Sequence, residues 1–346
     1  MVNSGGSIPE ARADKILDLM MGLWKAGAVK AAMELDFFTK IAEGNRSAKA
    51  VAAAAQSSER GTVSLLNALC GLGLLRRRGP EYDLSPEAEA YLSRTSPFYI
   101  EDVALGIAAP WEWDAFGRLA DAVKGGKATI YPYMKGEEAS CLEKMVLAIG
   151  TLASSSAEQI CRLLNIGSLP RENFRVLDIA CGTGIYGFTI AMREPKARIT
   201  SVDRRQVIRL AQGIAEKMGV KEQIAFRPGN IFSVLFEDDA YDLILIGNVL
   251  HQYSGEQTRK LLQKAYKAAK SPGGTIVIHD FVADDERSKE TACLLMSLDM
   301  LLYTDDGDVH TFSEYKSWLE EAGFKDVAGP TLVPTNLTSI VTGKKF

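Results

Sequence analysis

Three glycines follow an apolar segment in a spacing that is typical of a ligand-binding turn. Residues 174–179 (FRVLDI) are mostly apolar, which predicts a buried strand of a parallel sheet. The glycines come next in a G-x-G-x-x-G pattern, at Gly182, Gly184 and Gly187. Glycine is favoured here because the chain turns tightly and a ligand must approach the backbone closely. With the helix predicted over 188–193, this pattern indicates a site for a nucleotide-like ligand.

Two acidic residues narrow the choice of ligand. Asp178 precedes the first glycine by four residues, and Asp203 follows a second predicted strand at 197–202. Asp203 is placed to accept hydrogen bonds from both hydroxyls of a ribose. Asp178 would repel a pyrophosphate, but it would attract the ammonium group of a ligand with an amino-acid end. The segment D-I-A-C-G-T-G resembles motif I of class I methyltransferases, which implies S-adenosylmethionine (SAM) as the cofactor.

The three histidines of the chain all follow or end predicted strands, or precede the last helix. His251 follows the strand predicted within 241–253, His279 and Asp280 close the strand at 275–281, and His310 precedes a helix at 312–324. Carboxyl ends of parallel strands meet at one edge of a sheet, where ligands bind. Removing a proton from a hydroxyl requires a base with a pKa near neutrality, which favours histidine. A divalent metal held by these histidines and Asp280 is an alternative.

Composition predicts an ordinary globular protein. The 346 residues are 47% hydrophobic and 24% charged with a net charge of −4, so nothing indicates a nucleic acid or a membrane surface as partner. There is no apolar run of membrane-spanning length and no signal-peptide pattern. Five scattered cysteines without metal spacing are typical of reduced thiols, so we expect a cytoplasmic protein.

The N-terminal part reads as helices followed by a winged helix-turn-helix. Apolar residues between 12 and 41 recur at helical spacing, with a break expected near Gly27. A helix pair at 48–56 and 59–75 precedes a hairpin at 76–85, which is the wing. DNA binding is not favoured, because the second helix of the pair offers few polar side chains that reach a groove.

The whole layout from about residue 15 resembles the O-methyltransferases that include plant caffeate and bacterial polyketide enzymes. Their N-terminal domain dimerises, and counterparts exist for ELDFFTKIAEG and for the wing GLLRRRGPEYDLSPEAEAYL. The resemblance implies His251 as catalytic base and Asp280 as the acid that orients it. Gln252 and Tyr253 replace the last two residues of the family's H-D-W triplet. The second acid of plant members is absent, and His310 stands near its place.

The resemblance also implies residues that bind the cofactor and the acceptor. In the family the turn after the third strand reads adenine, and here Asn230 stands where the family has an acid. The expected cofactor residues are Asp178, Gly182, Gly184, Asp203, Arg204, Asn230, Ile231, Phe232, Gly247, Asn248 and Ser154. The expected acceptor residues are Trp111, Trp113, Phe116, Met145, His279 and His310. No resident metal is expected in this main interpretation.

These inferences give one main prediction and two alternatives. The fold is α/β, a Rossmann-like doubly wound sheet with an N-terminal all-α winged-helix dimerisation domain. The domains are 1–97 for dimerisation, 98–168 for a helical connector that forms the acceptor pocket, and 169–346 for SAM binding. We expect a homodimer that methylates a phenolic or enolic hydroxyl of a small, aromatic acceptor. The alternatives are a C-methyltransferase, in which a metal assists, and a ligand-sensing DNA-binding regulator.

Overall fold

The chain divides into two compact units, Met1–Ala109 and Pro110–Phe346. The computed structural model describes residues 13–100, 106–129, 139–168, 172–333 and 337–346. Among these residues no helix is both long enough and apolar enough to cross a membrane. A separate connector over 98–168 stays a prediction, because its helices from Pro110 onward belong to the second unit.

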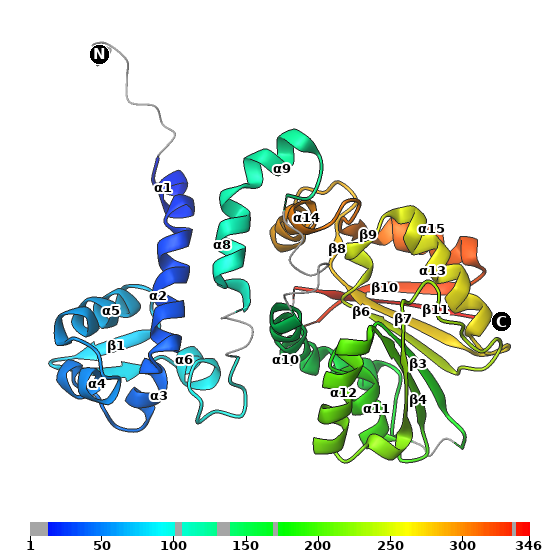
Figure 1. Cartoon of the computed structure of the whole chain (residues 1–346), viewed down its shortest axis with the longest axis horizontal. Coiled ribbons are helices and arrows are strands. Elements are labelled where there is room, and N and C mark those ends of the chain that lie inside the picture. The colour runs from blue at the N-terminus through cyan, green and yellow to red at the C-terminus, as the bar shows by residue number, and fades with distance from the viewer. Residues whose placement is uncertain (1–12, 101–105, 130–138, 169–171, 334–336) are drawn as a thin grey trace, which may run out of the picture. The chain divides into compact units, whose positions relative to one another are not determined.

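The first unit is a small helical domain with one hairpin (Figure 1). Its elements are α1 (Asp14–Met20), α2 (Gly22–Glu34), α3 (Phe37–Ala42), α4 (Ala48–Ala54), α5 (Glu59–Gly71), β1 (Leu75–Arg78), β2 (Glu81–Leu84) and α6 (Pro86–Tyr91). Ser47, Ser58 and Ser85 precede α4, α5 and α6, and each side chain accepts a hydrogen bond from the first turn of its helix. The predicted helix pair and wing are therefore confirmed.

The predicted break near Gly27 is wrong. Helix α2 runs through Gly27 without interruption, and the chain breaks instead at Met21. Glycine inside a helix costs only about 1 kcal/mol relative to alanine, so the packing of Ala32 and Met33 in the core outweighs it. Helix α1 and the start of α2 leave large apolar side chains exposed: Ile16, Leu17, Leu19, Met20, Leu23 and Trp24.

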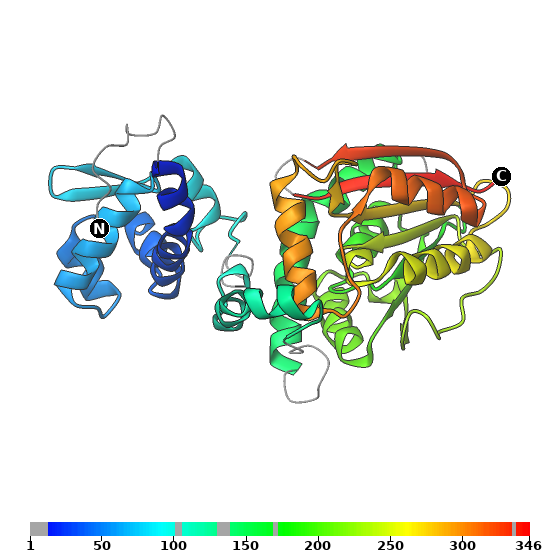
Figure 2. The ribbon, with the colours of Figure 1, turned by 90° about the horizontal axis from the view of Figure 1, so that it is seen from above.

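A seven-stranded sheet forms the centre of the second unit, in the order β10-β11-β7-β6-β3-β4-β5. The strands are β3 (Arg175–Ile179), β4 (Arg198–Asp203), β5 (Ile224–Pro228), β6 (Leu243–Gly247), β7 (Thr275–Asp280), β10 (Lys325–Leu332) and β11 (Ser339–Lys344). The five strands from β5 to β7 are parallel, whereas β11 is antiparallel to β7 and forms a hairpin with β10. This hairpin, red in Figure 2, closes one edge of the sheet.

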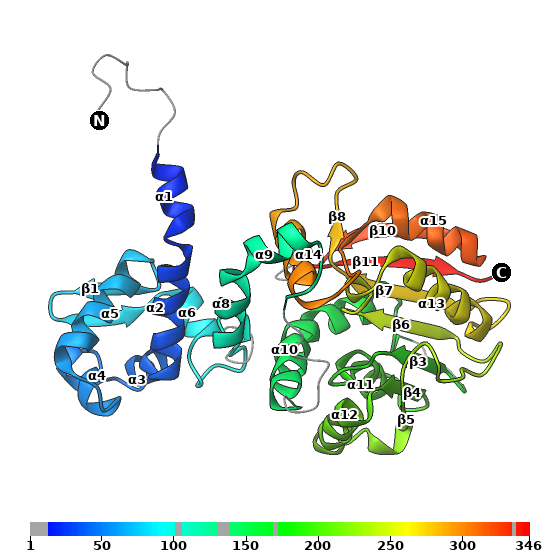
Figure 3. The same cartoon turned by 45° about the horizontal axis from the view of Figure 1, so that its top comes forward.

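Helices cover both faces of this sheet (Figure 3). The helices described in the second unit are α8 (Pro110–Gly117), α9 (Leu119–Gly125), α10 (Ala139–Leu163), α11 (Ile185–Arg193), α12 (Arg205–Lys217), α13 (Gly255–Ala268), α14 (Thr291–Tyr303) and α15 (Phe312–Ala322). Of these, α10, α11 and α12 cover one face of the sheet and α13 and α15 cover the other, whereas α8 and α9 pack against α14. Val176 packs in the core formed with α10, α11 and α12, and its neighbour Leu177 packs in the core formed with α13 and α15. Successive residues of a strand point to opposite faces, so the apolar run of β3 fills two cores. The predicted doubly wound α/β fold is confirmed.

Candidate active site

The glycine turn joins β3 to α11 at the carboxyl end of the central strand. Gly182 and Gly184 have φ angles of 56° and 81°, which favour glycine. A Cβ atom at Gly182 would meet only Val146 Cγ1, at 3.8 Å. A Cβ atom at Gly184 would lie 2.2 Å from the Phe188 ring. The space beside Gly182 is thus open enough for a ligand to approach, whereas packing at the start of α11 requires Gly184.

Asp178 lies buried beneath this turn with one carboxylate oxygen unpaired. Its Oδ2 accepts a hydrogen bond from the Gly187 N–H at 3.3 Å, and Oδ1 has no hydrogen-bond partner among the described residues. Burial raises the pKa of Asp178 to about 7, the Gly187 N–H opposes the rise, and the charge of Asp203 adds to it. An orphaned buried oxygen calls for a donor or a cation, so Asp178 fits a ligand with an ammonium group.

Asp203 connects the end of β4 to the same turn. Its Oδ2 accepts from the Gly182 N–H at 2.9 Å, and its Oδ1 accepts from the Arg204 N–H at 2.7 Å. Burial raises the pKa of Asp203, although these two N–H groups oppose the rise. Each carboxylate oxygen has a further lone pair, so both can still accept from ribose hydroxyls. Arg204 itself is exposed.

The turn after β5 lies against the segment that carries His251. Asn230 Oδ1 accepts from the Phe232 N–H at 2.9 Å, which leaves its amide N–H groups for a ligand. Ile231 is buried, and the Phe232 ring packs edge-on against Tyr253 with centroids 4.9 Å apart. The turn predicted to bind the cofactor therefore contacts Tyr253, two residues after His251 in the chain.

Helix α10 packs on the glycine turn through a small residue. A Cβ atom at Gly150 would lie 2.4 Å from Thr183 Oγ1, so only glycine allows this approach. Thr183 Oγ1 is buried and has no hydrogen-bond partner among the described residues. Ser154, one turn further on, is exposed and donates a hydrogen bond to the Gly150 carbonyl at 3.2 Å.

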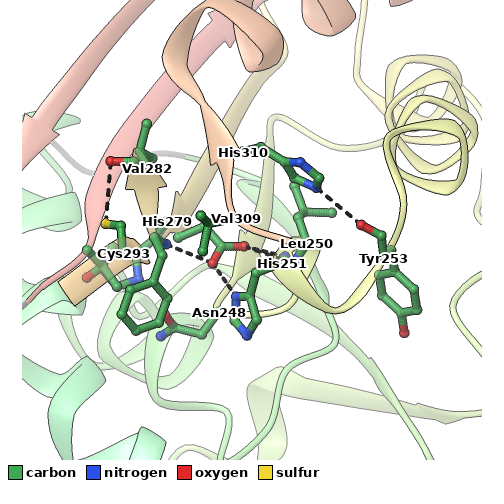
Figure 4. A network of polar contacts seen from close by, with 12 residues as sticks. Asn248, Leu250, His251, Tyr253, His279, Val282, Cys293, Val309 and His310 are labelled. Carbon is green, nitrogen blue, oxygen red and sulfur yellow. Dashed lines mark hydrogen bonds and ion pairs between the residues drawn. The ribbon is translucent and has the colours of Figure 1, made fainter. Parts of the chain in front are cut away.

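His251 and Asp280 form a buried pair at the carboxyl ends of β6 and β7. Figure 4 shows His251 and its neighbour Leu250. His251 Nδ1 lies 2.5 Å from Asp280 Oδ1, and Asp280 Oδ2 accepts from the Leu250 N–H at 2.8 Å. Burial opposes ionisation of Asp280, but His251, the Phe281 N–H and the charge of His310 together outweigh burial, so the pKa of Asp280 is lowered. An ionised Asp280 holds a proton on His251 Nδ1, which leaves Nε2 as the basic nitrogen. Nε2 makes no hydrogen bond to the described residues.

The other two histidines are engaged within the protein. His279 contacts the Tyr186 hydroxyl through Nδ1 and the Thr338 hydroxyl through Nε2, both at 2.6 Å, and is 1% exposed. Burial lowers its pKa to about 4. A contact between His279 and the acceptor, as predicted, would break one of these bonds.

His310 is engaged in a similar way. Its Nε2 donates to the Tyr253 carbonyl at 3.2 Å, as Figure 4 shows, and its ring packs on Tyr315 and Trp318. Burial lowers its pKa. Among the described residues, no group of three or more His, Cys, Asp and Glu side chains is arranged to hold a metal ion.

The predicted acceptor residues lie on two helices of the second unit. Trp111, Trp113 and Phe116 belong to α8, and Met145 belongs to α10. Trp113 and Phe116 are 36% and 42% exposed, whereas Trp111 and Met145 are partly buried.

An acidic pair near His251 escaped the sequence reasoning. Asp299 of α14 lies beside Glu112 of α8. Burial and then the charge of Glu112 raise the pKa of Asp299 to about 7, while His251 opposes the rise. The sequence does contain a pattern that could have indicated Asp299, because it is the only charged residue in the apolar run TACLLMSLDMLLY.

This geometry defines a class of protein. A parallel sheet carries at its carboxyl edge a glycine turn, a buried acid below it, an acid on the next strand and a His–Asp pair. Such an edge suits an enzyme that binds a nucleoside cofactor with an amino-acid end and removes a proton from a second substrate.

Comparison with known proteins gives the family. The model of the O-methyltransferase domain matches residues 116–325, more than half of the chain, and the model of the O-methyltransferase dimerisation domain matches residues 17–94. The chain belongs to the O-methyltransferase family, and it is a methyltransferase that uses SAM. The C-methyltransferase and DNA-binding alternatives are not favoured.

Individual relatives cover nearly the whole chain. It is 27% identical to a tetracenomycin polyketide synthesis 8-O-methyl transferase of Streptomyces glaucescens, over 90% of this chain and 91% of that protein. It is 28% identical to a 3-hydroxy-5-methyl-1-naphthoate 3-O-methyltransferase of Streptomyces sahachiroi, over 95% of this chain and 94% of that protein. The crystal structure of human N-acetylserotonin methyltransferase in complex with SAM superposes with a TM-score of 0.82 at 24% identity, over 98% and 99% of the two chains.

Proposed function

We propose that this enzyme transfers the methyl group of SAM to a phenolic or enolic hydroxyl of a small aromatic acceptor, with His251 as general base. The observation that carries this proposal is the His251–Asp280 pair, which leaves Nε2 basic at the edge of the sheet where ligands bind. SAM supplies an activated methyl group when bound. What the protein must add is alignment of the hydroxyl and removal of its proton.

The residues around the glycine turn would hold the cofactor. Asp178 would receive the ammonium group, because its Oδ1 has no other partner among the described residues. Asp203 would accept from the ribose, the amide of Asn230 would donate to the adenine, and Ile231 and Phe232 would offer it apolar contacts. Gly182, Arg204, Gly247, Asn248 and Ser154 remain candidates for further contacts.

An aromatic acceptor suits the side chains of α8 and α10. Trp111 and Met145 are partly buried and would offer apolar area to a flat ring. The name of one relative supports a fused aromatic acceptor, since that enzyme acts on a naphthoate. Another relative acts in polyketide synthesis.

Two copies of the chain would associate through α1 and α2. The exposed side chains of Leu19, Met20 and Trp24 form apolar area that a monomer rarely leaves in contact with water. The match to the dimerisation domain covers all of α2 and the part of α1 from Leu17 onward.

Methyl transfer can be tested before the natural acceptor is known. Purified protein is incubated with SAM carrying a deuterated methyl group and a panel of phenols that includes 1-naphthol and hydroxynaphthoates. We expect at least one product labelled on oxygen, located by mass spectrometry and NMR. Label on a ring carbon would contradict O-methylation, and no label on any phenol despite SAM binding would contradict the acceptor class.

A further inference from the structure

A chain of buried hydrogen bonds links the helix of the glycine turn to the strand that carries Asp280. Asn248 Nδ2 donates to the Tyr186 hydroxyl at 2.9 Å, and this hydroxyl contacts His279 Nδ1 at 2.6 Å. His279 Nε2 contacts the Thr338 hydroxyl at 2.6 Å. Tyr186, His279 and Thr338 are at most 6% exposed. A buried polar network is costly unless all its members are satisfied, so it tends to fix one arrangement.

Two members of this network, His279 and Asn248, lie next to the catalytic pair. His279 directly precedes Asp280 in β7, and its carbonyl accepts from the Asn248 N–H at 2.7 Å. Asn248 has a φ of 50° and begins the turn that leads into the short helix Leu250–Gln252, which carries His251. The far side of this turn is held by Asp280, which accepts from the Leu250 N–H. The segment that carries His251 is therefore fixed by two hydrogen bonds, one from Asn248 to the His279 carbonyl and one from Leu250 to Asp280.

Gly247 makes room for the network. A Cβ atom there would lie 2.5 Å from Tyr186 Cε2, so any other residue would displace the ring. Burial lowers the pKa of His279 to about 4, so the ring is neutral and presents one donor and one acceptor. Hydroxyl groups stand at both nitrogens and can take either role.

We propose that Tyr186 and His279 are positioning residues that hold Asn248, and through it the His251–Asp280 pair, in register with the cofactor turn. This role deepens the proposed function, on which it rests. It differs from the acceptor contact expected for His279, because neither ring nitrogen is available to a ligand while the network is intact.

The chain has only three histidines, which makes a direct test practical. Protein labelled with ¹⁵N-histidine is saturated with S-adenosylhomocysteine, and the ring-nitrogen resonances are assigned by substituting each histidine in turn. In the wild type we expect His251 protonated on Nδ1. In Tyr186→Phe, which leaves Asn248 Nδ2 without its partner, we expect the His251 resonances to shift towards a mixture of both neutral tautomers.

Tyr241→Phe is the matched control, because Tyr241 is a buried tyrosine that precedes β6, at the opposite end of that strand from Asn248. It should leave the His251 resonances in place, and both variants should bind S-adenosylhomocysteine within about twofold of the wild type by calorimetry. If Tyr186→Phe does not fold, Thr338→Val interrupts the network at its other end, and Thr338→Ser should restore the wild-type spectrum. His251 resonances unchanged in both Tyr186→Phe and Thr338→Val would overturn the proposal. Since the readout is the state of His251 and not turnover, this failure is distinct from a failure of His251 as base.

Discussion

Asp280 binds both the ring and the backbone of His251. Its Oδ1 lies 2.5 Å from His251 Nδ1, and its Oδ2 accepts from the His251 N–H at 3.3 Å. The same Oδ1 accepts from the Phe281 N–H at 2.8 Å. One carboxylate thus fixes the position of the loop and the tautomer of the ring.

The substitution Asp280→Asn should therefore impair turnover far more than cofactor binding. The amide cannot hold the proton on His251 Nδ1 as a carboxylate does, so we expect turnover to fall about 100-fold or more. SAM affinity, measured by calorimetry, should change less than about twofold. Turnover near the wild-type level in a folded variant would contradict the pairing.

The stability of the same variant should depend on pH with a definite sign. The pKa of Asp280 is lowered in the folded protein, so its ionisation stabilises the fold above the unfolded value of about 3.9. This contribution is lost as the pH falls through the lower, folded-state pKa. The stability advantage of wild type over Asp280→Asn should thus be present at neutral pH and vanish in acid, as thermal unfolding can measure.

Most of the fold could be predicted from the sequence, because the spacing of apolar residues indicates which segments form helices and strands. The apolar run 174–179, Asp203 and the strand ending at His279 and Asp280 were each expected where the structure has them. The prediction of a helix break near Gly27 was wrong, because tertiary packing outweighs the low helix propensity of one glycine.

The site could be predicted only in part. The rule that parallel strands end at one edge placed His251 and Asp280 near each other, and the family resemblance implied that they pair. The hydroxyls that form hydrogen bonds with His279 could not be predicted from the sequence, because Tyr186 and Thr338 lie 93 and 59 residues away in the chain. The packing of Phe188 beside Gly184 could not be predicted either, because the glycine pattern does not indicate which side chain fills that space. Cofactor binding at Gly184 stays a prediction.

Gly182 and Gly184 should respond differently to alanine. Both have positive φ, so both variants carry backbone strain of about 1 kcal/mol. Only in Gly184→Ala does the new Cβ collide with the Phe188 ring, so we expect that variant to unfold at a clearly lower temperature. Gly182→Ala should instead lose SAM affinity, since its Cβ occupies the face left open to a ligand. Equal loss of stability in the two variants would argue against this division.

Association of two chains should depend on the exposed residues of α1 and α2. Light scattering of the wild type is expected to give twice the chain mass of 37.7 kDa. Trp24 is 72% exposed, and Trp24→Glu would place a charge in the proposed interface. We expect this variant to be a monomer at micromolar concentration. Leu235→Glu is the control, because Leu235 is 83% exposed in the other unit and should have no effect on mass.

Binding of SAM should weaken as the pH falls through the pKa of Asp178. That pKa is raised to about 7, so below neutrality Asp178 is protonated and cannot attract an ammonium group. The ammonium group itself stays largely protonated up to about pH 7.5. We expect affinity to drop roughly tenfold between about pH 7.5 and about pH 5.5, and Asp178→Asn to bind weakly with little pH dependence.

The cofactor-free protein provides an independent check on Asp178. Because its folded pKa lies above the unfolded value of about 3.9, its contribution to stability is greatest in acid and is lost as the pH rises through about 7. Asp178→Asn should then be at least as stable as wild type above neutrality. A variant that is much less stable there would show that Asp178 serves the fold and not the ligand.

Removal of the His251 side chain separates base catalysis from alignment. His251→Ala should leave SAM affinity nearly intact, because the ring faces the acceptor in the proposed function. Turnover of a neutral phenol should fall roughly 100- to 10,000-fold, the usual effect of a positioned base. The turnover of a phenol that is already ionised at the assay pH should fall much less, because no proton remains to be removed. Rates measured across phenols of decreasing pKa should therefore converge for wild type and variant. Full activity of His251→Ala on a neutral phenol would mean that transfer proceeds by proximity alone, and that the His251–Asp280 pair only shapes the loop.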